Sequence, residues 1–253
     1  MSGHRWAARA AAGAAAVALT VTGGAVAQAD DDIDSLAAEE IVDLSRDALL
    51  DVRSLHLSAR GSIDGSGADV SLDLTLDREG NCTGGIDMGG DGSVEIVKRG
   101  DDVWLKPDAA FWERHVPIGG STFDAILDGR YMKASADHPR LLGVTEVCDL
   151  DTFRELIADN AGTADRGTLT KGERTEVNGT PAVPVTRVED GERLTAYVAA
   201  EGTPYPVRIT VRDAGEEGTV DFSGFDRPVP TATPPADETV DVTALLGRSV
   251  SPL

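Results

Sequence analysis

The hydrophobic residues near the start of the chain recur every three or four positions before the spacing changes. The first set, which falls on one side of a helix, is Ile33, Ala37, Ile41, Leu44, Ala48 and Val52. This spacing predicts an amphipathic helix with Asp34 or Ser35 as its N-cap. The next set, which alternates with polar residues, is Val70, Leu72, Leu74 and Leu76. A period of two predicts a half-buried β-strand.

Short strands separated by turn residues continue this pattern. Residues 78–81 predict a turn, and a return strand carries Ile86 and Met88. Residues 94–98 and 103–106 predict two more strands, separated by a turn at Gly100-Asp101. Neighbouring strands joined by short turns are typical of an antiparallel meander.

The middle of the chain has helical spacing instead. Phe123, Ile126 and Leu127 predict a short helix capped by Ser121 or Thr122. A second short helix is predicted around Phe153, Leu156 and Ile157, with Asp151 as its cap.

Strands resume at residue 168, and turn residues recur about every ten positions. The strands predicted between these turns cover residues 182–188, 194–199, 206–211 and 219–225. Four prolines between residues 228 and 235 then predict an extended tail. Strands and helices do not alternate, so the pattern favours an α+β fold over a doubly wound parallel sheet.

The first 29 residues resemble a secretory signal peptide. A basic start containing Arg5 and Arg9 is followed by a short run of alanine, valine and leucine, and then by A-x-A cleavage signals ending at Ala27 and Ala29. The run is too short and too rich in small residues for an ordinary membrane span, and an uncleaved anchor is the alternative. We therefore expect an extracytoplasmic protein, secreted or held in the cell envelope.

The charge balance limits the partners. The chain has 44 acidic against 23 basic residues, for a net charge of −21. No basic stripe interrupts this acidic sequence, and an acidic surface repels phosphate backbones. The composition therefore excludes nucleic acid as a partner.

The two cysteines, Cys82 and Cys148, form an even pair in a chain predicted to be exported. An oxidising compartment favours one disulfide between them, and two unrelated buried thiols are the alternative. Neither cysteine belongs to a C-x-x-C motif, so redox catalysis and zinc binding are not indicated.

The sequence contains no motif of a known catalytic site. A nucleophile elbow, a zinc-protease helix, a P-loop and a dinucleotide-binding loop are all missing. Beyond the leader the histidines are His56, His115 and His138, and a Ser–His–Asp triad stays open because its members can lie far apart in sequence. We predict no enzyme, no cofactor and no metal site.

The apolar residues of the first meander are more informative. The strand positions that share one face are Val70, Leu72, Leu74, Leu76, Ile86, Met88, Val94 and Ile96. A second sheet could fill such a face as an ordinary core. A curved sheet capped by a few helices could instead enclose an apolar cavity along it.

Several short segments resemble the LppX/LprG-type envelope lipoproteins of actinobacteria, which have a LolA-like fold. They occur in the family's order, at residues 102–112 (DVWLKPDAAFW), 130–133 (RYMK), 178–182 (NGTPA), 202–209 (GTPYPVRI) and 220–226 (VDFSGFD). The leading helix agrees as well. The lipobox cysteine of these lipoproteins is missing here, so the resemblance does not extend to a lipid anchor.

The resemblance implies a strongly curved antiparallel half-barrel of roughly ten strands, closed by a few helices around an apolar cavity. It implies a LolA-like domain over residues 30–227, followed by a Pro-rich extended tail over 228–253. Related proteins hold acyl chains in the cavity and carry lipids or lipoproteins. Beside the strand residues above, the mouth or lid would contain Trp104, Phe111, Trp112, Phe123 and Tyr131.

Two functions follow as hypotheses. The first is an exported carrier that binds a lipid or another apolar small molecule, with a membrane surface or an envelope protein as a further partner. The second is a non-enzymatic envelope scaffold or stress-sensor module that contacts a protein partner through the same sheet.

Overall fold

The computed structural model describes residues 32–62, 69–116, 118–139, 141, 145–154, 168–213 and 216–243. The predicted leader lies outside these residues, and so do Leu156 and Ile157. Among the described helices, none has the length and hydrophobicity needed to cross a membrane.

The first helix begins later than its spacing predicts. Asp32 caps a 3-10 turn, η1 (Ile33–Ser35), and the helix α1 covers Ala38–Asp51. The prediction of Asp34 or Ser35 as N-cap is therefore wrong. Ala37 occupies the N-cap position, and its backbone N–H donates to the Glu40 carboxylate at 2.9 Å. A first-turn glutamate that accepts from the N-cap backbone replaces a capping side chain here.

Two arginines close the other end of α1. Arg78 donates from Nη2 to the carbonyl of Leu50 at 2.8 Å, and Arg154 donates from Nε to the same oxygen at 2.6 Å. The last carbonyls of a helix have no partner within the helix, and cations near them also complement the helix dipole. The two side chains tie α1 to the β2–β3 turn and to the segment 145–154.

The first meander contains two strands more than the pattern predicted. Its strands are β1 (Ser54–Ser62), β2 (Asp69–Asp77), β3 (Cys82–Asp87), β4 (Ser93–Arg99), β5 (Asp102–Pro107) and β6 (Tyr131–Ser135). The 3-10 turn η2 (Gly89–Asp91) joins β3 to β4. The pattern did not predict β1 or β6. Leu55, Leu57 and Ala59 nevertheless alternate with polar residues within β1.

The inserted helices differ in detail from the prediction. The helix α2 (Ala109–His115) was not expected, and α3 (Gly120–Leu127) begins after Gly119 rather than at Ser121 or Thr122. The 3-10 turn η3 (Glu146–Cys148) leads into a helical stretch that starts at Leu150. Asp149, not Asp151, caps this stretch, since its carboxylate accepts from the N–H groups of Asp151 and Thr152.

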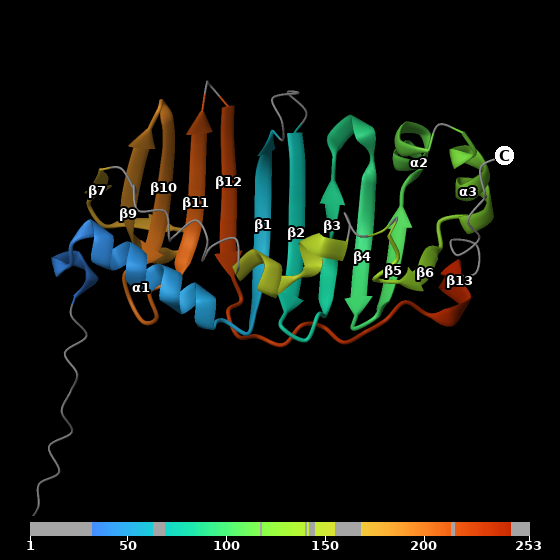
Figure 1. The fold of residues 1–253 in the computed structure, drawn as a ribbon, viewed down its shortest axis with the longest axis horizontal. Helices are drawn as coiled ribbons and strands as arrows, with labels where there is room; N and C mark the ends of the chain where they lie inside the picture. Colours follow the sequence, from blue (N-terminus) through green and yellow to red (C-terminus); the bar gives the residue numbers. More distant parts are fainter. Residues whose placement is uncertain are drawn as a thin grey trace, which may run out of the picture. The chain divides into compact units, whose positions relative to one another are not determined.

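The second meander completes one sheet with the first. Its strands are β7 (Leu169–Lys171), β8 (Thr175–Val177), β9 (Thr180–Glu189), β10 (Glu192–Ala199), β11 (Pro206–Asp213) and β12 (Glu216–Ser223), and β13 (Thr239–Asp241) follows. The order across the sheet is β13-β6-β5-β4-β3-β2-β1-β12-β11-β10-β9-β7, with β8 paired to β9. The two meanders therefore meet where β1 pairs with β12 (Figure 1).

This arrangement is the predicted α+β fold, a large curved sheet that does not close into a barrel. One difference concerns the predicted tail. Arg99 donates to the carbonyls of Pro230 and Ala232, and the tail then passes through η4 (Ala236–Glu238) into β13. Because β13 runs parallel to β6, the sheet is mixed rather than wholly antiparallel.

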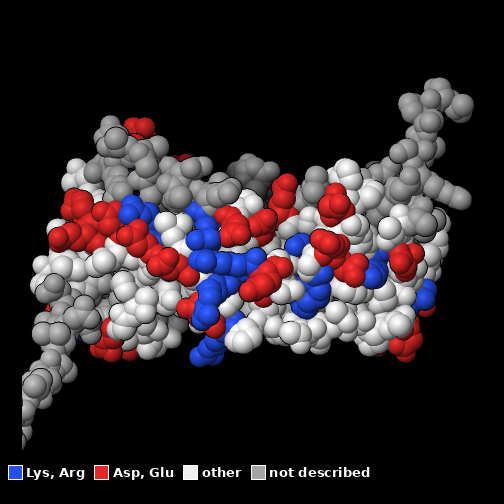
Figure 2. All heavy atoms as spheres, turned by 60° about the horizontal axis from the view of Figure 1, so that its bottom comes forward, with Lys and Arg blue, Asp and Glu red and all other residues white. Residues whose placement is uncertain are grey.

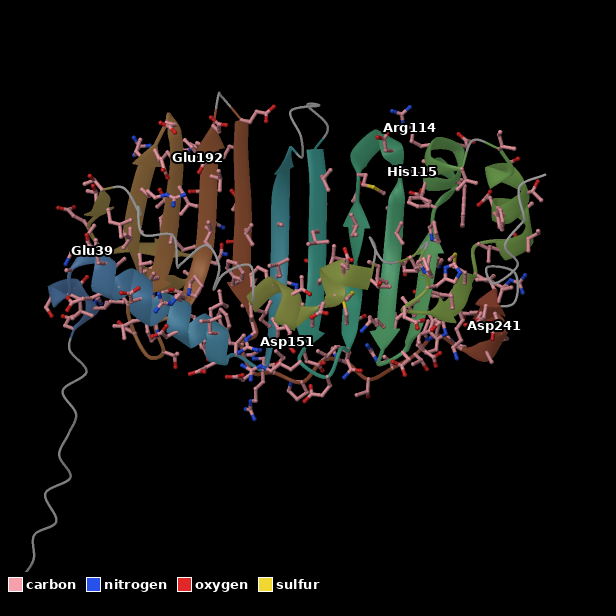
Figure 3. All side chains as sticks on the ribbon, in the orientation of Figure 1. Glu39, Arg114, His115, Asp151, Glu192 and Asp241 are labelled. Carbon is pink, nitrogen blue, oxygen red and sulfur yellow. A yellow bond between two sulfur atoms is a disulfide. The ribbon has the colours of Figure 1, made fainter. Side chains whose placement is uncertain are left out.

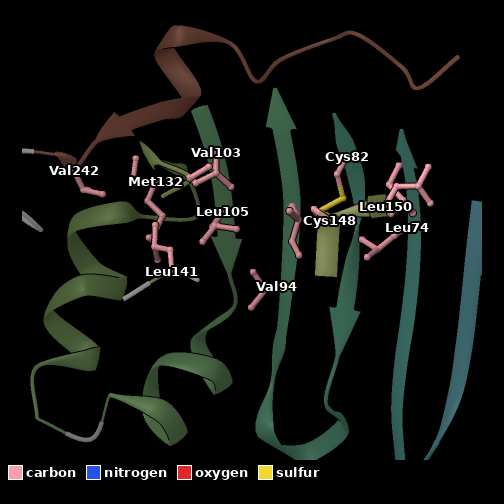
Figure 4. Packing of buried hydrophobic residues seen from close by; sticks show 14 of the residues in the cluster. Leu74, Cys82, Val94, Val103, Leu105, Met132, Leu141, Cys148, Leu150 and Val242 are labelled. Carbon is pink, nitrogen blue, oxygen red and sulfur yellow. A yellow bond between two sulfur atoms is a disulfide. The ribbon is translucent and has the colours of Figure 1, made fainter. Parts of the chain in front are cut away.

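The inner face of the sheet, defined here as the face covered by α1, α2 and the segment 145–154, carries the core. Ile41 of α1 packs with Val183 and Val185 at one end of the sheet. A larger cluster gathers side chains of β1–β6, α2, α3 and the segment 145–154 (Figure 4). Within it, Cys82 and Cys148 form the predicted disulfide, which ties the segment 145–154 to β3.

Candidate functional site

A row of apolar side chains crosses the inner face without full cover. Direct cross-strand pairing links Ala196, Ile209, Val220, Ala59, Leu72 and Ile86 on β10, β11, β12, β1, β2 and β3. All six are partly exposed, and they are called the half-buried row below. With neighbouring strands ~4.8 Å apart, the row is roughly 24 Å long.

Both ends of this row lie under helices. The next partner beyond Ala196 is Val185, which is buried against α1. The next partner beyond Ile86 is Val94, which is buried in the same cluster as Trp112 of α2. The open part of the inner face is therefore bounded along the row by α1 and by α2.

Two residues further along each strand, a second row of side chains on the same face is buried. The buried row consists of Phe222, Leu74, Ile96, Leu105 and Met132, and the pairing continues through the half-buried Leu57 and Gly84. Leu150 belongs to the same cluster, and the ring of Phe153 lies 6.0 Å from that of Phe222. The disulfide-linked segment 145–154 thus covers the buried row.

Two neighbouring glycines lie on the partly exposed part of the inner face. Gly61 and Gly218 lie on β1 and β12, beyond Ala59 and Val220. A Cβ on Gly61 would lie 2.9 Å from the Cα of Gly218, so the two strands approach closely there. Among the described residues, the atom nearest to a Cβ on Gly218 would be the Arg60 carbonyl oxygen at 3.9 Å. That distance is ordinary van der Waals contact, so these residues do not block a Cβ there.

The helix α2 is fixed at its start by Asp108. The Asp108 carboxylate accepts from the N–H of Phe111 at 2.8 Å and from the N–H and Oγ of Ser93 at 2.9 and 2.8 Å. Burial alone would raise the pKa of Asp108, but these hydrogen bonds outweigh it, and the pKa is lowered. The N-cap thus joins α2 to the first residue of β4.

The structure brings most of the predicted site residues to this face. Leu72 and Ile86 belong to the half-buried row, and Val70 and Met88 are half-buried near it. Those that are buried in the core cluster are Leu74, Leu76, Val94, Ile96 and Trp112. Phe111 is half-buried against the same cluster, and Phe123 of α3 stacks on Trp112.

Two predicted residues lie on the opposite, outer face. Trp104 pairs with Lys133, whose ammonium lies 5.2 Å from the centre of its ring. Tyr131 donates to Oε2 of Glu95 at 2.6 Å, and burial together with this hydrogen bond raises its pKa to about 12. Strict alternation along β5 and β6 separates both side chains from Leu105 and Met132. We leave Trp104 and Tyr131 out of the site.

Sequence reasoning missed four members of the half-buried row. Ala59 lies on the unpredicted strand β1, while Ala196, Ile209 and Val220 lie on predicted strands of the second meander. The alternation in these strands was available as a signal. What the sequence did not show is that β1 and β12 pair, which places both meanders on one face.

Polar side chains connect the strands across the outer face. Arg208 donates from Nε and Nη2 to the Asp221 carboxylate at 2.6 and 3.0 Å. The His56 ring lies 3.1 Å from Ser223 Oγ and 3.1 Å from Asp73 Oδ1. Such a Ser–His–Asp contact could suggest catalysis, but it lies on the solvated outer face, away from the apolar site. We interpret it as a cross-strand link between β12, β1 and β2.

The described residues contain no group of three or more His, Cys, Asp or Glu arranged to hold a metal ion. The half-buried row itself consists of apolar side chains alone. Its chemistry is therefore that of a surface on which methylene groups can be buried.

Solved structures with a similar fold are known. LprF from Mycobacterium bovis aligns with a TM-score of 0.54 at 14% identity, over 78% of this chain and 96% of that one. This likeness supports a LolA-like fold and concerns the fold alone. No protein-family profile matches the chain, and no curated protein matches it by sequence.

Two further solved structures align with lower TM-scores. The lipoprotein LppX from Mycobacterium tuberculosis aligns with a TM-score of 0.49 at 14% identity, over 77% of this chain and 98% of that one. MucB, in its complex with MucA from Pseudomonas aeruginosa, aligns with a TM-score of 0.36 at 14% identity, over 79% of this chain and 59% of that one.

Proposed function

We propose that this protein is an exported carrier that binds a lipid or another apolar molecule with an acyl chain. The observation that carries the proposal is the half-buried row, an apolar strip that crosses six strands between α1 and α2. Each methylene group buried there would gain about 0.8 kcal/mol without any charged partner. At roughly 24 Å, the row exceeds one leaflet of a bilayer, which is about 15 Å thick in hydrocarbon.

Three further observations support the proposal. The predicted leader agrees with export, and the disulfide between Cys82 and Cys148 agrees with an oxidising compartment. The similarity to LprF of Mycobacterium bovis supports a LolA-like fold.

The first test is native mass spectrometry of the mature protein, purified from its own envelope or growth medium. We expect an adduct of lipid mass that is removed by organic extraction. The extracted protein should then take up added fatty acid or phospholipid. A clean apo mass with no uptake would overturn the carrier function and favour the scaffold or stress-sensor alternative.

Matched variants locate the site. The double substitution Leu72→Asn and Ile86→Asn places amides in the half-buried row and should abolish uptake. The control is Val97→Asn, because Val97 is also half-buried but pairs with Trp104 on the outer face. Equal uptake by the double variant and the control would show that the ligand lies elsewhere.

A further inference from the structure

The exposed large hydrophobic side chains are concentrated on one short segment. Of five in the described part of the chain, Ile118 is 94% exposed, Ile126 51% and Phe123 42%. The other two, Leu44 and Val188, lie on α1 and β9 and are 45% and 49% exposed. Single exposed hydrophobic residues are ordinary, whereas a group of them marks an interaction surface.

The two helices α2 and α3 hold this segment in place. The rings of Phe123 and Trp112 are stacked with centroids 5.6 Å apart, and Trp112 is part of the core cluster. A Cβ on Gly120 would lie 2.3 Å from the carbonyl oxygen of Trp112, so only glycine permits this approach of the two helices. Ile118 lies in the turn between these two helices.

The charge pattern of this segment differs from that of the chain. Residues 116–127 contain no lysine, arginine or glutamate and a single aspartate, Asp124, in a chain with 44 acidic and 23 basic residues. Both flanks carry mixed charge, with Glu113 and Arg114 on one side and Asp128 and Arg130 on the other. Arg114 forms an ion pair with Asp91 at 3.0 Å. Arg130 donates to the carbonyls of Leu127 and Ile126 at 3.0 and 2.9 Å, which holds its guanidinium beside Ile126.

An exposed apolar segment with a single charged residue, in an otherwise strongly acidic chain, fits a lipid surface. Apolar side chains can enter the acyl region, while arginine stems lie along it and their charges stay at the level of the phosphates. Figure 3 places Arg114 and His115 at α2, and Asp151 toward the opposite ends of the strands. At that opposite edge, Figure 2 shows basic side chains with acidic ones on both sides. Arg78 and Arg154 there are engaged in closing α1.

We propose that α3 and the α2–α3 turn dock on the surface of a lipid bilayer, with Ile118 and Ile126 entering it. This inference rests on the proposed carrier function, which it extends to the route of the ligand. The helix α2 covers the Val94 end of the half-buried row, since Trp112 and Val94 share one cluster. An acyl chain that leaves the bilayer at the docked hairpin therefore has to pass α2 to reach the row.

The test is co-sedimentation of the purified mature protein with phosphatidylcholine vesicles. The test variant is Ile118→Ser with Ile126→Ser, and the matched control is Leu44→Ser with Val188→Ser, which also removes two exposed aliphatic side chains. We expect the test variant to bind vesicles at least about tenfold more weakly than the wild type, and the control to bind like the wild type. Binding by the wild type should persist in about 0.5 M salt, because salt screens charges but does not weaken apolar burial.

Fatty-acid uptake without vesicles separates this inference from the carrier function. A test variant that takes up fatty acid normally but no longer sediments with vesicles supports docking by Ile118 and Ile126. Vesicle binding without any fatty-acid uptake keeps the docking and overturns the carrier function. Three results overturn the docking, namely no vesicle binding by the wild type, equal binding by both double variants, and binding that disappears in salt. Equal circular dichroism and melting temperature of the two variants exclude misfolding as the cause.

Discussion

The two apolar rows on the inner face are made of similar residues but lie in different surroundings. Leu74 of the buried row and Leu72 of the half-buried row are two positions apart on β2 and point to the same side. Leu74 is fully buried, and Leu72 is partly exposed. The difference arises from the segment 145–154, which covers the first row and is tied to the sheet by a disulfide. Whether an apolar strand position is closed into the core or left partly exposed is decided by a remote part of the chain.

Removing the disulfide should have the largest effect on this contrast. Cys82 and Cys148 are 66 positions apart, and a crosslink over such a loop stabilises the fold by roughly 4 kcal/mol in the chain-entropy model. Cys82→Ser should therefore lower the melting temperature in oxidising buffer and leave the reduced protein nearly unchanged. Thermal melts of both proteins with and without reductant check this, and four equal values would contradict it.

The next largest effect is a difference in stability between alanine variants of Leu74 and Leu72. Leu74→Ala should cost about 3 kcal/mol of unfolding free energy, because it leaves a cavity in a closed core. Leu72→Ala should cost about 1 kcal/mol and should reduce fatty-acid uptake instead. Urea denaturation gives both free energies, and similar losses from the two variants would show that the rows are equally closed.

A third comparison uses Gly61 and Gly218, the neighbouring glycines that lie beyond Ala59 and Val220 of the half-buried row. Gly61→Leu should lower stability by about 2 kcal/mol, because its Cβ would collide with the backbone of Gly218. Gly218→Leu meets no such backbone and should fold normally while filling the open face. We expect a normal melting temperature and a lower capacity for long acyl chains, measured by native mass spectrometry. Unchanged capacity would place the ligand away from Gly218.

A smaller effect on stability is expected at α2, the helix at the Val94 end of the half-buried row. Asp108→Ala removes the N-cap of α2 and its link to Ser93, which should cost about 1 kcal/mol. Because the folded pKa of Asp108 is lowered, its contribution is present above the unfolded pKa, about 3.8, and is lost as the pH falls through the folded pKa. The variant and the wild type should therefore differ in stability at neutral pH and converge in acid.

The smallest effect is expected on the outer face. Tyr131→Phe removes one hydrogen bond to Glu95 and should change stability by less than about 0.5 kcal/mol, with normal lipid uptake. The pKa of Tyr131 is raised to about 12, so its contribution is present below pH 10 and is lost as the pH rises through about 12. An ultraviolet difference titration of the two proteins should show one phenol ionising near pH 12. Ionisation near pH 10 would contradict the buried contact.

Alternation and turn residues were sufficient to predict the α+β class, both meanders and one face of β2–β4. The even pair of cysteines in a chain with a predicted leader was sufficient to predict the disulfide. Alternation and turn residues failed where the neighbours of a strand come from elsewhere in the chain. Trp104 and Tyr131 were grouped with Phe111 and Trp112 because they are aromatic and close in sequence, yet the period of two along β5 and β6 places them on the outer face. The helix α2 was missed although Asp108 is an ordinary N-cap residue that accepts from the N–H of Phe111 within the helix. Only the link from Asp108 to Ser93 comes from a distant part of the chain.

The pairing of β1 with β12 also has a consequence for the order of events during synthesis. His56 contacts Ser223 across a separation of 167 residues, so the middle of the sheet depends on two segments made far apart in time. Contacts of such long range form slowly, since a large loop must close before they stabilise the fold. A growing chain that ends before β12 contains two incomplete sheet halves and no continuous apolar row. The continuous apolar row therefore forms only once β12 has been made and has paired with β1.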